Sequence, residues 1–255
     1  MWLLDLGNTR LKLARVDADA AVLDIGATAV TALAHAEAEF DARLVRALSS
    51  ATSGDTAWLA SVAPDSVRQR VEAVLDALGL RVRPARTQSA CAGLRIAYAD
   101  PARLGVDRFL ALLAARRRGG DWLLASFGSA LTVDLLDAEG RHRGGLIGIA
   151  PAHQVDALRT RFPALDRGEG DAATRWAADT PDAVAAGARR QALGLLLAAF
   201  DDARAELGRA PRVLLGGGDA GSFADELSRR LGIEVETHDA LVLEGLAVYA
   251  SALDG

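Results

Sequence analysis

The chain has 255 residues, of which 51% are hydrophobic, so it can bury a large core as one large domain or two smaller ones. Its 29 basic and 34 acidic residues give a net charge of -5 and are interspersed, which argues against a general nucleic-acid-binding surface. The single cysteine, Cys91, excludes an internal disulfide and a cysteine-rich zinc site. We expect a cytoplasmic protein without a membrane partner, because the N-terminus lacks a signal-peptide pattern and no apolar run reaches the roughly 20 residues of a membrane span.

The first half predicts a strand meander followed by alternating helices and strands. The expected meander strands are residues 2–5, 11–16 and 21–27. Leucine and valine recur at helical spacing over residues 32–48, which predicts a helix. The apolar stretch "AWLASVAP" predicts a buried strand ending at Pro64, and the helix that follows to Leu78 has Asp65 as its expected N-cap.

The second half repeats this order. The stretch "WLLASFGSALTVDLLDAEGRHRGGLIGIAP" supplies an apolar strand, a glycine corner, a second strand, a turn at "DAEG" and a third strand. A long helix over residues 181–207, the strand "RVLLGGG", a helix through "SFADELSRRL", the strand "IEVET" and a terminal helix in "LVLEGLAVYASAL" follow. Two related α/β lobes fit this repeat better than one continuous parallel sheet, with a boundary near residues 101–120.

The first glycine corner, in "LLDLGNTRLKLARVD", brings an acid, a glycine, an amide and a hydroxyl together. Gly7 lets the backbone approach a ligand closely, and Asn8 and Thr9 can donate hydrogen bonds to phosphate oxygens. Asp5 repels bare phosphate but can orient a hydrated magnesium ion that neutralises it. Taken alone, these residue types are also typical of an ordinary turn.

A second corner at the equivalent point of the repeat strengthens the ligand-binding interpretation. The sequence "FGSALTVD" places Gly128 and Ser129 in the corresponding turn, although a purely structural hairpin is possible. Two polar glycine corners of a duplicated fold predict a triphosphate site in an interdomain cleft. Gly216, Gly217 and Gly218 stand between a strand and a helix, where close approach of a flat ligand such as adenine would explain three glycines that pack poorly.

With these motifs in this order, the chain resembles the type III pantothenate kinase family of the ASKHA superfamily, which includes actins, sugar kinases and heat-shock ATPases. The resemblance rests on "DLGNT", "LGVDR", "FGSALTVD" and "GGGDA" and covers nearly the whole chain. It implies an α/β fold of two duplicated ribonuclease H-like lobes with an interdomain cleft, an N-terminal lobe at 1–115 and a C-terminal lobe at 116–255. It also implies ATP-dependent phosphorylation of pantothenate to 4'-phosphopantothenate, the first step of coenzyme A synthesis, with Mg2+ accompanying ATP and a homodimer whose substrate site lies near the interface.

The resemblance further implies roles for individual residues. Asp107 is the expected proton acceptor, and a carboxylate there can position a hydroxyl nucleophile and take its proton. ATP binding is implied for Asp5, Leu6, Gly7, Asn8, Thr9, Arg10, Leu11, Lys12, Ser129, Gly216, Gly217 and Gly218. Pantothenate binding is implied for Tyr98, Gly105, Val106, Asp107, Arg108 and Thr180. From the residues alone, Tyr98 fits a half-buried strand position equally well, and Thr180 fits a helix cap.

One departure from the family concerns a monovalent cation, K+ or NH4+. Ser126 occupies the position where the family carries an aspartate that helps to bind this cation. A serine offers a neutral oxygen without the charge, so we expect a weak or missing cation site and a reduced dependence on potassium. The same departure leaves open a nucleotide-binding regulatory protein, such as a transcriptional accessory factor, that has lost catalysis. A kinase for another small hydroxylated substrate is the other alternative.

Overall fold

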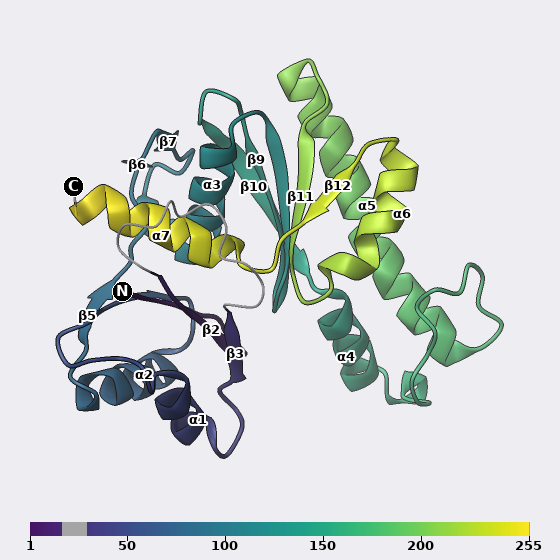
Figure 1. Cartoon of the computed structure of the whole chain (residues 1–255). Helices are drawn as coiled ribbons and strands as arrows, with labels where there is room; N and C mark the ends of the chain where they lie inside the picture. Colours follow the sequence, from purple (N-terminus) through teal and green to yellow (C-terminus); the bar gives the residue numbers. More distant parts are fainter. Residues whose placement is uncertain (17–29, 255) are drawn as a thin grey trace. The chain divides into compact units, whose positions relative to one another are not determined.

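The computed structural model describes residues 1–16 and 30–254, and the strand predicted at residues 21–27 lies outside this range. Strands and helices alternate along much of the chain, as Figure 1 shows. In chain order the elements are β1 Trp2–Leu6, β2 Arg10–Arg15, β3 Thr31–Ala34, α1 Phe40–Ala47, β4 Thr56–Ser61, α2 Asp65–Ala77, β5 Arg81–Pro84, β6 Ala90–Cys91, β7 Leu94–Arg95, α3 Val106–Arg118, β8 Trp122–Phe127, β9 Ala130–Leu136, β10 His142–Ile149, α4 Pro151–Arg161, α5 Thr180–Leu207, β11 Arg212–Gly217, α6 Ala220–Leu231, β12 Val235–Thr237 and α7 Leu241–Asp254.

The first five-stranded sheet has the order β3-β2-β1-β4-β5, with β1 antiparallel to β2 and parallel to β4. Leu4 and Leu6 of β1 share a buried core with Leu44 of α1 and Val71 of α2. Because side chains alternate across a strand, Asp5 lies on the opposite face of the sheet. Helices α3 and α7 contact this part of the sheet, so Asp5 shares a side of the sheet with them.

Helices α3 and α7 pack closely on each other. Tyr249 of α7 meets Trp58 of β4 and Phe109 of α3 edge-on, with ring centroids 5.6 Å and 6.1 Å apart. A Cβ at Gly245 would lie 1.8 Å from the backbone oxygen of Leu110, so only glycine allows this approach of the two helices. The position of α3, which carries Asp107, therefore depends on its contact with α7.

The second five-stranded sheet repeats the first, with the order β10-β9-β8-β11-β12. In both sheets a meander of three strands is extended by two strands parallel to its first strand. Leu123 and Phe127 of β8 belong to a core with Leu193 of α5 and Phe223 of α6. The duplicated α/β architecture predicted from the sequence is thus confirmed, whereas the cleft stays a prediction.

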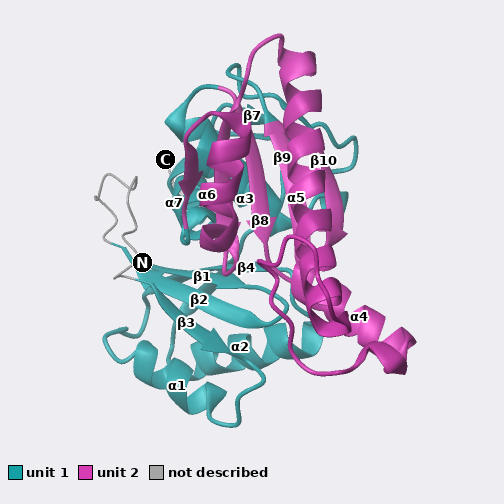
Figure 2. Ribbon diagram, turned by 90° about the vertical axis from the view of Figure 1, so that its right-hand side faces the viewer, with its two compact units in different colours: residues 1–120, 136–144, 239–255 teal, residues 121–135, 145–238 magenta. Residues whose placement is uncertain are grey.

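The chain forms two compact units, coloured separately in Figure 2. Unit 1 consists of residues 1–120, 136–144 and 239–255, and unit 2 of residues 121–135 and 145–238. Unit 1 thus includes α7 and the turn between β9 and β10. The division at 115/116, which the family resemblance implies, stays a prediction.

Two local predictions were wrong. The helix expected over residues 32–48 is confined to α1, because residues 31–34 pair with β2 as β3 and bury Leu33. Asp65 is the first residue of α2 rather than its cap, which is Pro64; the Asp65 carboxylate instead lies 3.0 Å from the Arg68 guanidinium. Pairing with β2 outweighed the helical periodicity at residues 31–34, and Asp65 stands in the first turn of α2, where the helix dipole favours an acid.

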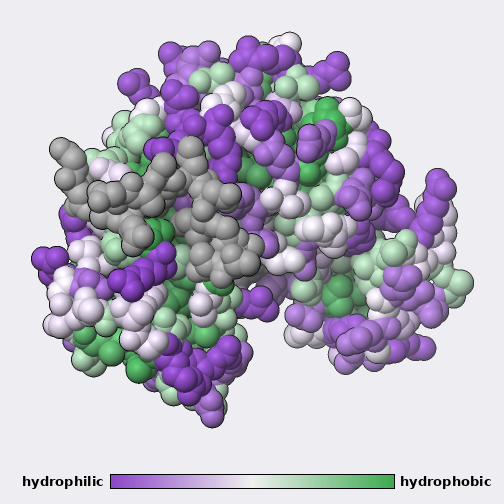
Figure 3. Space-filling model, in the orientation of Figure 1, coloured by the Kyte–Doolittle hydropathy of each residue, from purple (hydrophilic) through white to green (hydrophobic). Residues whose placement is uncertain are grey.

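The surface on the face seen in Figure 3 mixes hydrophilic and apolar side chains, with hydrophilic ones prominent. Within the described residues, we find no helix that is both long enough and apolar enough to cross a membrane.

Candidate active site

The first polar corner is a tight turn between β1 and β2 in unit 1. The Gly7 backbone N–H donates to the Arg10 carbonyl oxygen at 3.0 Å, which leaves Asn8 and Thr9 exposed at the tip. His35, which the sequence did not single out, contacts this turn: its Nε2 donates to the Asn8 carbonyl oxygen at 2.7 Å. Its backbone N–H also donates to the Thr9 carbonyl oxygen at 3.3 Å. Both bonds come from the residue that follows β3, so the end of β3 stabilises the turn.

Asp5 precedes this turn and is flanked by Lys12 on β2, its register partner. Burial, and after it the nearby charge of Asp107, raise the pKa of the Asp5 carboxyl to about 7 against the opposing effect of Lys12. Lys12 Nζ also donates to the Asp239 carbonyl oxygen at 2.8 Å, just before α7. The structure therefore brings two carboxylates and one ammonium group together within unit 1.

Asp107 lies in the first turn of α3, where the helix dipole favours a negative charge. Its Oδ1 accepts a hydrogen bond of 2.8 Å from the Arg108 backbone N–H. A Cβ at Gly105 would lie 2.6 Å from this oxygen, although the backbone of Gly105 is one that any residue can adopt. Gly105 therefore leaves room for the Asp107 carboxylate.

Arg108 and Tyr98 form a second polar pair beside Asp107. The buried Arg108 guanidinium donates to the Tyr98 hydroxyl at 3.4 Å and lies 6.0 Å from its ring centroid. The Tyr98 ring also stacks on His142, with centroids 6.0 Å apart and an interplanar angle of 8°. Tyr98 is half-buried, and its contact with Arg108 places it next to Gly105, Val106, Asp107 and Arg108, the other predicted substrate-binding residues of unit 1.

The second polar corner, in unit 2, is shorter than the first. The Gly128 N–H donates to the Ala130 carbonyl oxygen at 3.0 Å, so Ser129 alone forms the tip. Ser126 is exposed on β8 and pairs in register with Gly216 of β11. Ser126 stands on the first strand of its sheet, as Asp5 does in unit 1. The hydroxyl of Ser126 offers a neutral oxygen, whereas Asp5 offers a carboxylate.

Gly216 and Gly217 end β11 and Gly218 follows it, and the three glycines differ in what a side chain would meet there. Gly217 has φ +93°, and a Cβ there would lie 2.1 Å from the Phe127 carbonyl oxygen, so packing alone requires glycine. A Cβ at Gly216 would be in ordinary contact with the His238 carbonyl oxygen, and one at Gly218 would meet no atom within 4 Å. Within this run, Gly218 leaves open space for a ligand.

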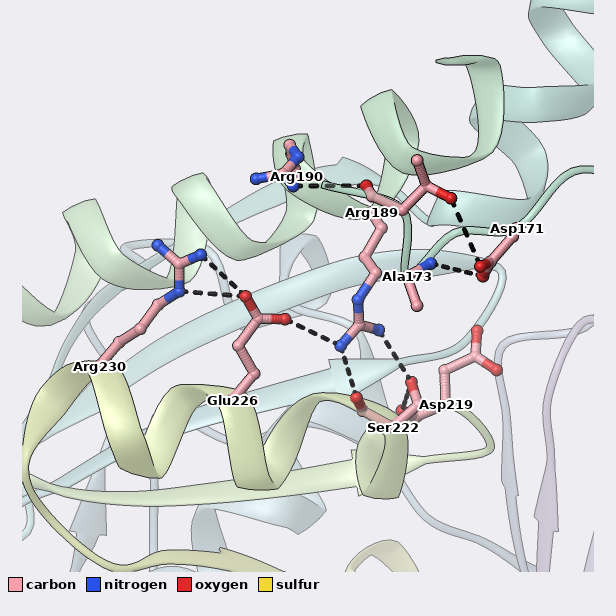
Figure 4. A network of polar contacts seen from close by, with 9 residues as sticks. Asp171, Ala173, Arg189, Arg190, Asp219, Ser222, Glu226 and Arg230 are labelled. Atoms are coloured by element: carbon pink, nitrogen blue, oxygen red, sulfur yellow. Dashed lines mark hydrogen bonds and ion pairs between the residues drawn. The ribbon is translucent and has the colours of Figure 1, made fainter. Parts of the chain in front are cut away.

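A polar pocket of about 520 Å³ lies between α5 and α6 in unit 2. As Figure 4 shows, Arg189 donates to the Ser222 carbonyl oxygen and to the Glu226 carboxylate, and Arg230 donates to the same carboxylate. Arg190 donates to backbone carbonyls of residues 174 and 175. The remaining charged lining residues are Arg175, Asp225 and Arg229. Five arginines against two acids make the pocket attractive to an anionic ligand.

A second pocket of about 580 Å³ in unit 2 is lined mainly by small and apolar residues of α5 and of the segment before it, together with Leu158 of α4. Thr180 lies at its edge as the first residue of α5. The cap of α5 is Asp179, whose side chain accepts from the Asp182 N–H at 3.1 Å, so Thr180 is free of the capping role.

The donor set suits a magnesium ion that arrives with ATP. Among residues 1–16 and 30–254, we find no group of three or more His, Cys, Asp or Glu side chains that could hold a metal ion by themselves. Mg2+ commonly keeps several waters and uses one or two carboxylates plus substrate phosphates. Asp5 and its neighbour Asp107 fit that pattern.

The duplicated strand order defines the ASKHA fold. The structure is similar to the crystal structure of a conserved putative Baf family transcriptional activator from Campylobacter jejuni, with a TM-score of 0.60 and 16% identity over all of both chains. It is also similar to that of a putative 2-dehydro-3-deoxygalactonokinase from Sinorhizobium meliloti, with a TM-score of 0.59 and 16% identity over 99% of this chain and 98% of the other. At this level of identity, both similarities concern the fold.

The chain belongs to the type III pantothenate kinase family, whose model matches residues 1–201. The type III pantothenate kinase of Xanthomonas campestris pv. campestris (strain B100) is 42% identical over 98% of this chain and 97% of its own. The family resemblance seen in the motifs is thereby confirmed. Membership implies a phosphotransferase of coenzyme A synthesis with pantothenate and ATP as its substrates.

Proposed function

We propose that this protein transfers the γ-phosphoryl group of ATP to the terminal hydroxyl of pantothenate, with Asp107 as the base. The observation that carries the proposal is the proximity of Asp107 to Asp5, which raises the pKa of Asp5, while Asp107 is adjacent to Arg108. One carboxylate thus faces the predicted phosphate corner, and the other adjoins a cation suited to an acidic substrate.

In the proposed step, the pantothenate hydroxyl oxygen attacks the γ-phosphorus and the bond from that phosphorus to the bridging oxygen of ADP breaks. Asp107 aligns the hydroxyl and accepts its proton as the new bond forms. The products are 4'-phosphopantothenate and ADP. Gly105 supports this role by leaving space for the carboxylate.

The phosphates of ATP are assigned to the corner at residues 5–12. Exposed Asn8 and Thr9 offer side-chain donors, and Asp5 orients the waters of Mg2+ when that ion accompanies the nucleotide. Lys12 supports Asp5 electrostatically and is tied to the Asp239 carbonyl oxygen. Ser129 and Gly216–Gly218 remain the assigned ATP contacts of unit 2.

The pocket between α5 and α6 is assigned to the adenosine end of ATP. Its helix α6 begins two residues after Gly218, and an arginine guanidinium can stack on a flat base. The net positive charge of its lining also suits a nucleotide.

Pantothenate is assigned to Arg108 and Tyr98. The guanidinium can form two parallel hydrogen bonds to the pantothenate carboxylate, and the Tyr98 hydroxyl adds a polar contact beside it. Thr180 is assigned as a further contact, supported by its hydroxyl at the edge of the second pocket of unit 2.

The homodimer is part of the proposal and is supported by exposed apolar side chains in unit 2. Ile147 and Ile149 are 67% and 57% exposed on the edge strand β10, and Trp176 is 89% exposed. Such side chains favour association. Sedimentation should give twice the monomer mass, and a fully active monomer would contradict a substrate site near the interface.

A substrate panel tests the function. The protein is incubated with Mg-ATP and pantothenate, or with other small hydroxylated acids and sugars, and products are identified by mass. We expect efficient formation of 4'-phosphopantothenate alone. Strong preference for another acceptor would overturn the substrate assignment, and ATP binding without any phosphorylated product would indicate a regulatory protein.

A further inference from the structure

Tyr98 has an aromatic neighbour that the proposed reaction does not use. His142, the first residue of β10, stacks on the Tyr98 ring with centroids 6.0 Å apart and planes 8° from parallel. His142 is only 3% exposed, so its ring is held by surrounding residues rather than by water. Both residues belong to unit 1.

The orientation of the His142 ring is fixed by a backbone hydrogen bond. The N–H of Ala97 donates to Nδ1 of His142 at 3.4 Å. Because an N–H group only donates, Nδ1 is the acceptor in this hydrogen bond. This bond joins His142 to Ala97, the residue directly before Tyr98. The edge of the His142 ring therefore contacts Ala97, and its face contacts Tyr98.

The turn that presents His142 is itself tied to this segment. The Arg95 N–H donates to the Gly140 carbonyl oxygen at 2.8 Å, and the Arg141 N–H donates to Asp137 Oδ1 at 2.7 Å. Arg116 of α3 donates to the Gly93 and Ala138 carbonyl oxygens at 3.1 Å and 3.2 Å. The turn, the Tyr98 segment and the helix of Asp107 are therefore joined.

Gly140 makes this close approach possible. Its φ is +85°, and a Cβ there would lie 2.2 Å from the Gly93 carbonyl oxygen. A side chain would push the turn away from the segment that leads to Tyr98.

From this geometry we propose that His142 is a positioning residue for pantothenate binding. Its ring keeps Tyr98 in the orientation in which the tyrosine hydroxyl accepts a hydrogen bond from Arg108, next to Asp107. His142 touches neither substrate and acts through Tyr98. This inference rests on the proposed role of Tyr98 in binding pantothenate.

The test measures KM and kcat for pantothenate, and KM for ATP, in the full-length protein and in three variants of His142. His142→Ala removes both the stack and the acceptor. His142→Phe keeps an aromatic ring, and His142→Asn keeps an acceptor near the position of Nδ1. Thermal unfolding of each variant verifies that it folds.

We expect His142→Ala to raise KM for pantothenate about three- to tenfold, which corresponds to the stabilisation that one aromatic pair contributes. The kcat and the KM for ATP should stay close to wild type. His142→Phe should restore most of the affinity and His142→Asn should not. If His142→Ala fails to fold, the Phe and Asn variants carry the same comparison. A folded His142→Phe variant as defective as His142→Asn would overturn the stacking role.

A double-mutant cycle separates this inference from the proposed function. If His142 acts through Tyr98, His142→Ala adds little to the KM defect of Tyr98→Ala. Full additivity of the two defects would overturn the inference while leaving Tyr98 as a substrate contact. An unchanged KM in Tyr98→Ala would overturn both the substrate role of Tyr98 and the inference built on it, although Asp107 could still be the base.

Discussion

Asp5 and Asp107 are electrostatically coupled within unit 1: burial, and then the charge of Asp107, raises the pKa of the Asp5 carboxyl to about 7. Asp5 lies next to the last residue of β1 and Asp107 in the first turn of α3, so the coupling joins two elements that are far apart in the sequence. Two carboxylates that repel each other provide a place where a magnesium ion carried by ATP would be stabilising. The destabilised charge of Asp5 therefore has a functional explanation.

Asp5→Asn should stabilise the free protein at alkaline pH. The pKa of Asp5 is about 7 when folded and about 3.8 when unfolded, so its contribution to the free energy of unfolding is fully present below pH 3.8 and is lost as the pH rises to 7. Above pH 7 the loss approaches about 4 kcal/mol at full burial and is smaller for the partly exposed side chain.

Urea unfolding at several pH values measures this effect. The difference in unfolding free energy between Asp5→Asn and wild type should grow from pH 4 to pH 8, while Asp5→Asn loses kinase activity. The exposed Asp76→Asn variant of α2 is the matched control and should show no such growth. A difference that is independent of pH would contradict the raised pKa.

Gly105→Ala should reduce turnover without unfolding the protein. The added Cβ would lie 2.6 Å from Asp107 Oδ1, and this flexible carboxylate can move aside more easily than backbone can. We expect kcat to fall by about tenfold or more, as for a displaced catalytic group, with an unchanged melting temperature. Gly194→Ala, on an exposed turn of α5 with no atom within 4 Å of the new Cβ, should keep full activity.

Gly245→Ala tests the packing that holds α3. Its Cβ would lie 1.8 Å from the Leu110 carbonyl oxygen, which belongs to a helix backbone and cannot rotate away. Overpacking of this kind should lower the free energy of unfolding by about 1–3 kcal/mol, despite the higher helix propensity of alanine. Urea unfolding measures the change. Unaltered stability would mean that α7 and α3 do not depend on this close contact.

The sequence predicted the duplicated strand order well, because apolar runs and glycine corners recur in both halves. It failed at residues 32–39, where Leu33 is at helical spacing from the apolar residues of α1 but instead pairs into the sheet. Strand pairing between distant segments has no local signal, so periodicity alone could not reveal β3. The contacts of α7 with α3 and β1 also join segments that are far apart in the sequence, so they have no local signal either.

The motifs also located the chemistry-bearing residues, but not the groups that hold them. Tyr98, Asp107 and Arg108 were expected from the family resemblance, whereas His142 stacks on Tyr98 from the start of β10. A lone histidine in a strand gives no sequence signal for such a contact. The space that Gly105 leaves for Asp107 is likewise a property of the three-dimensional structure that has no signal in the sequence.

Ser126→Asp should create a dependence on potassium. The wild-type hydroxyl supplies a neutral oxygen, so turnover should change little when K+ is replaced by Na+ at constant ionic strength. An aspartate at this exposed position of β8 would add the charge that a monovalent cation needs. Steady-state rates in KCl, NH4Cl and NaCl test this prediction, and a strict potassium requirement in the wild type would contradict it.

The most direct test of the proposed reaction is single-turnover phosphorylation of pantothenate by Asp107→Asn at saturating Mg-ATP. Loss of the proton acceptor should slow the chemical step by about 10²–10⁴-fold, with ATP binding and the melting temperature close to wild type. The exposed Asp76→Asn variant should react at the wild-type rate. A near-normal rate constant in folded Asp107→Asn would show that Asp107 is not the base.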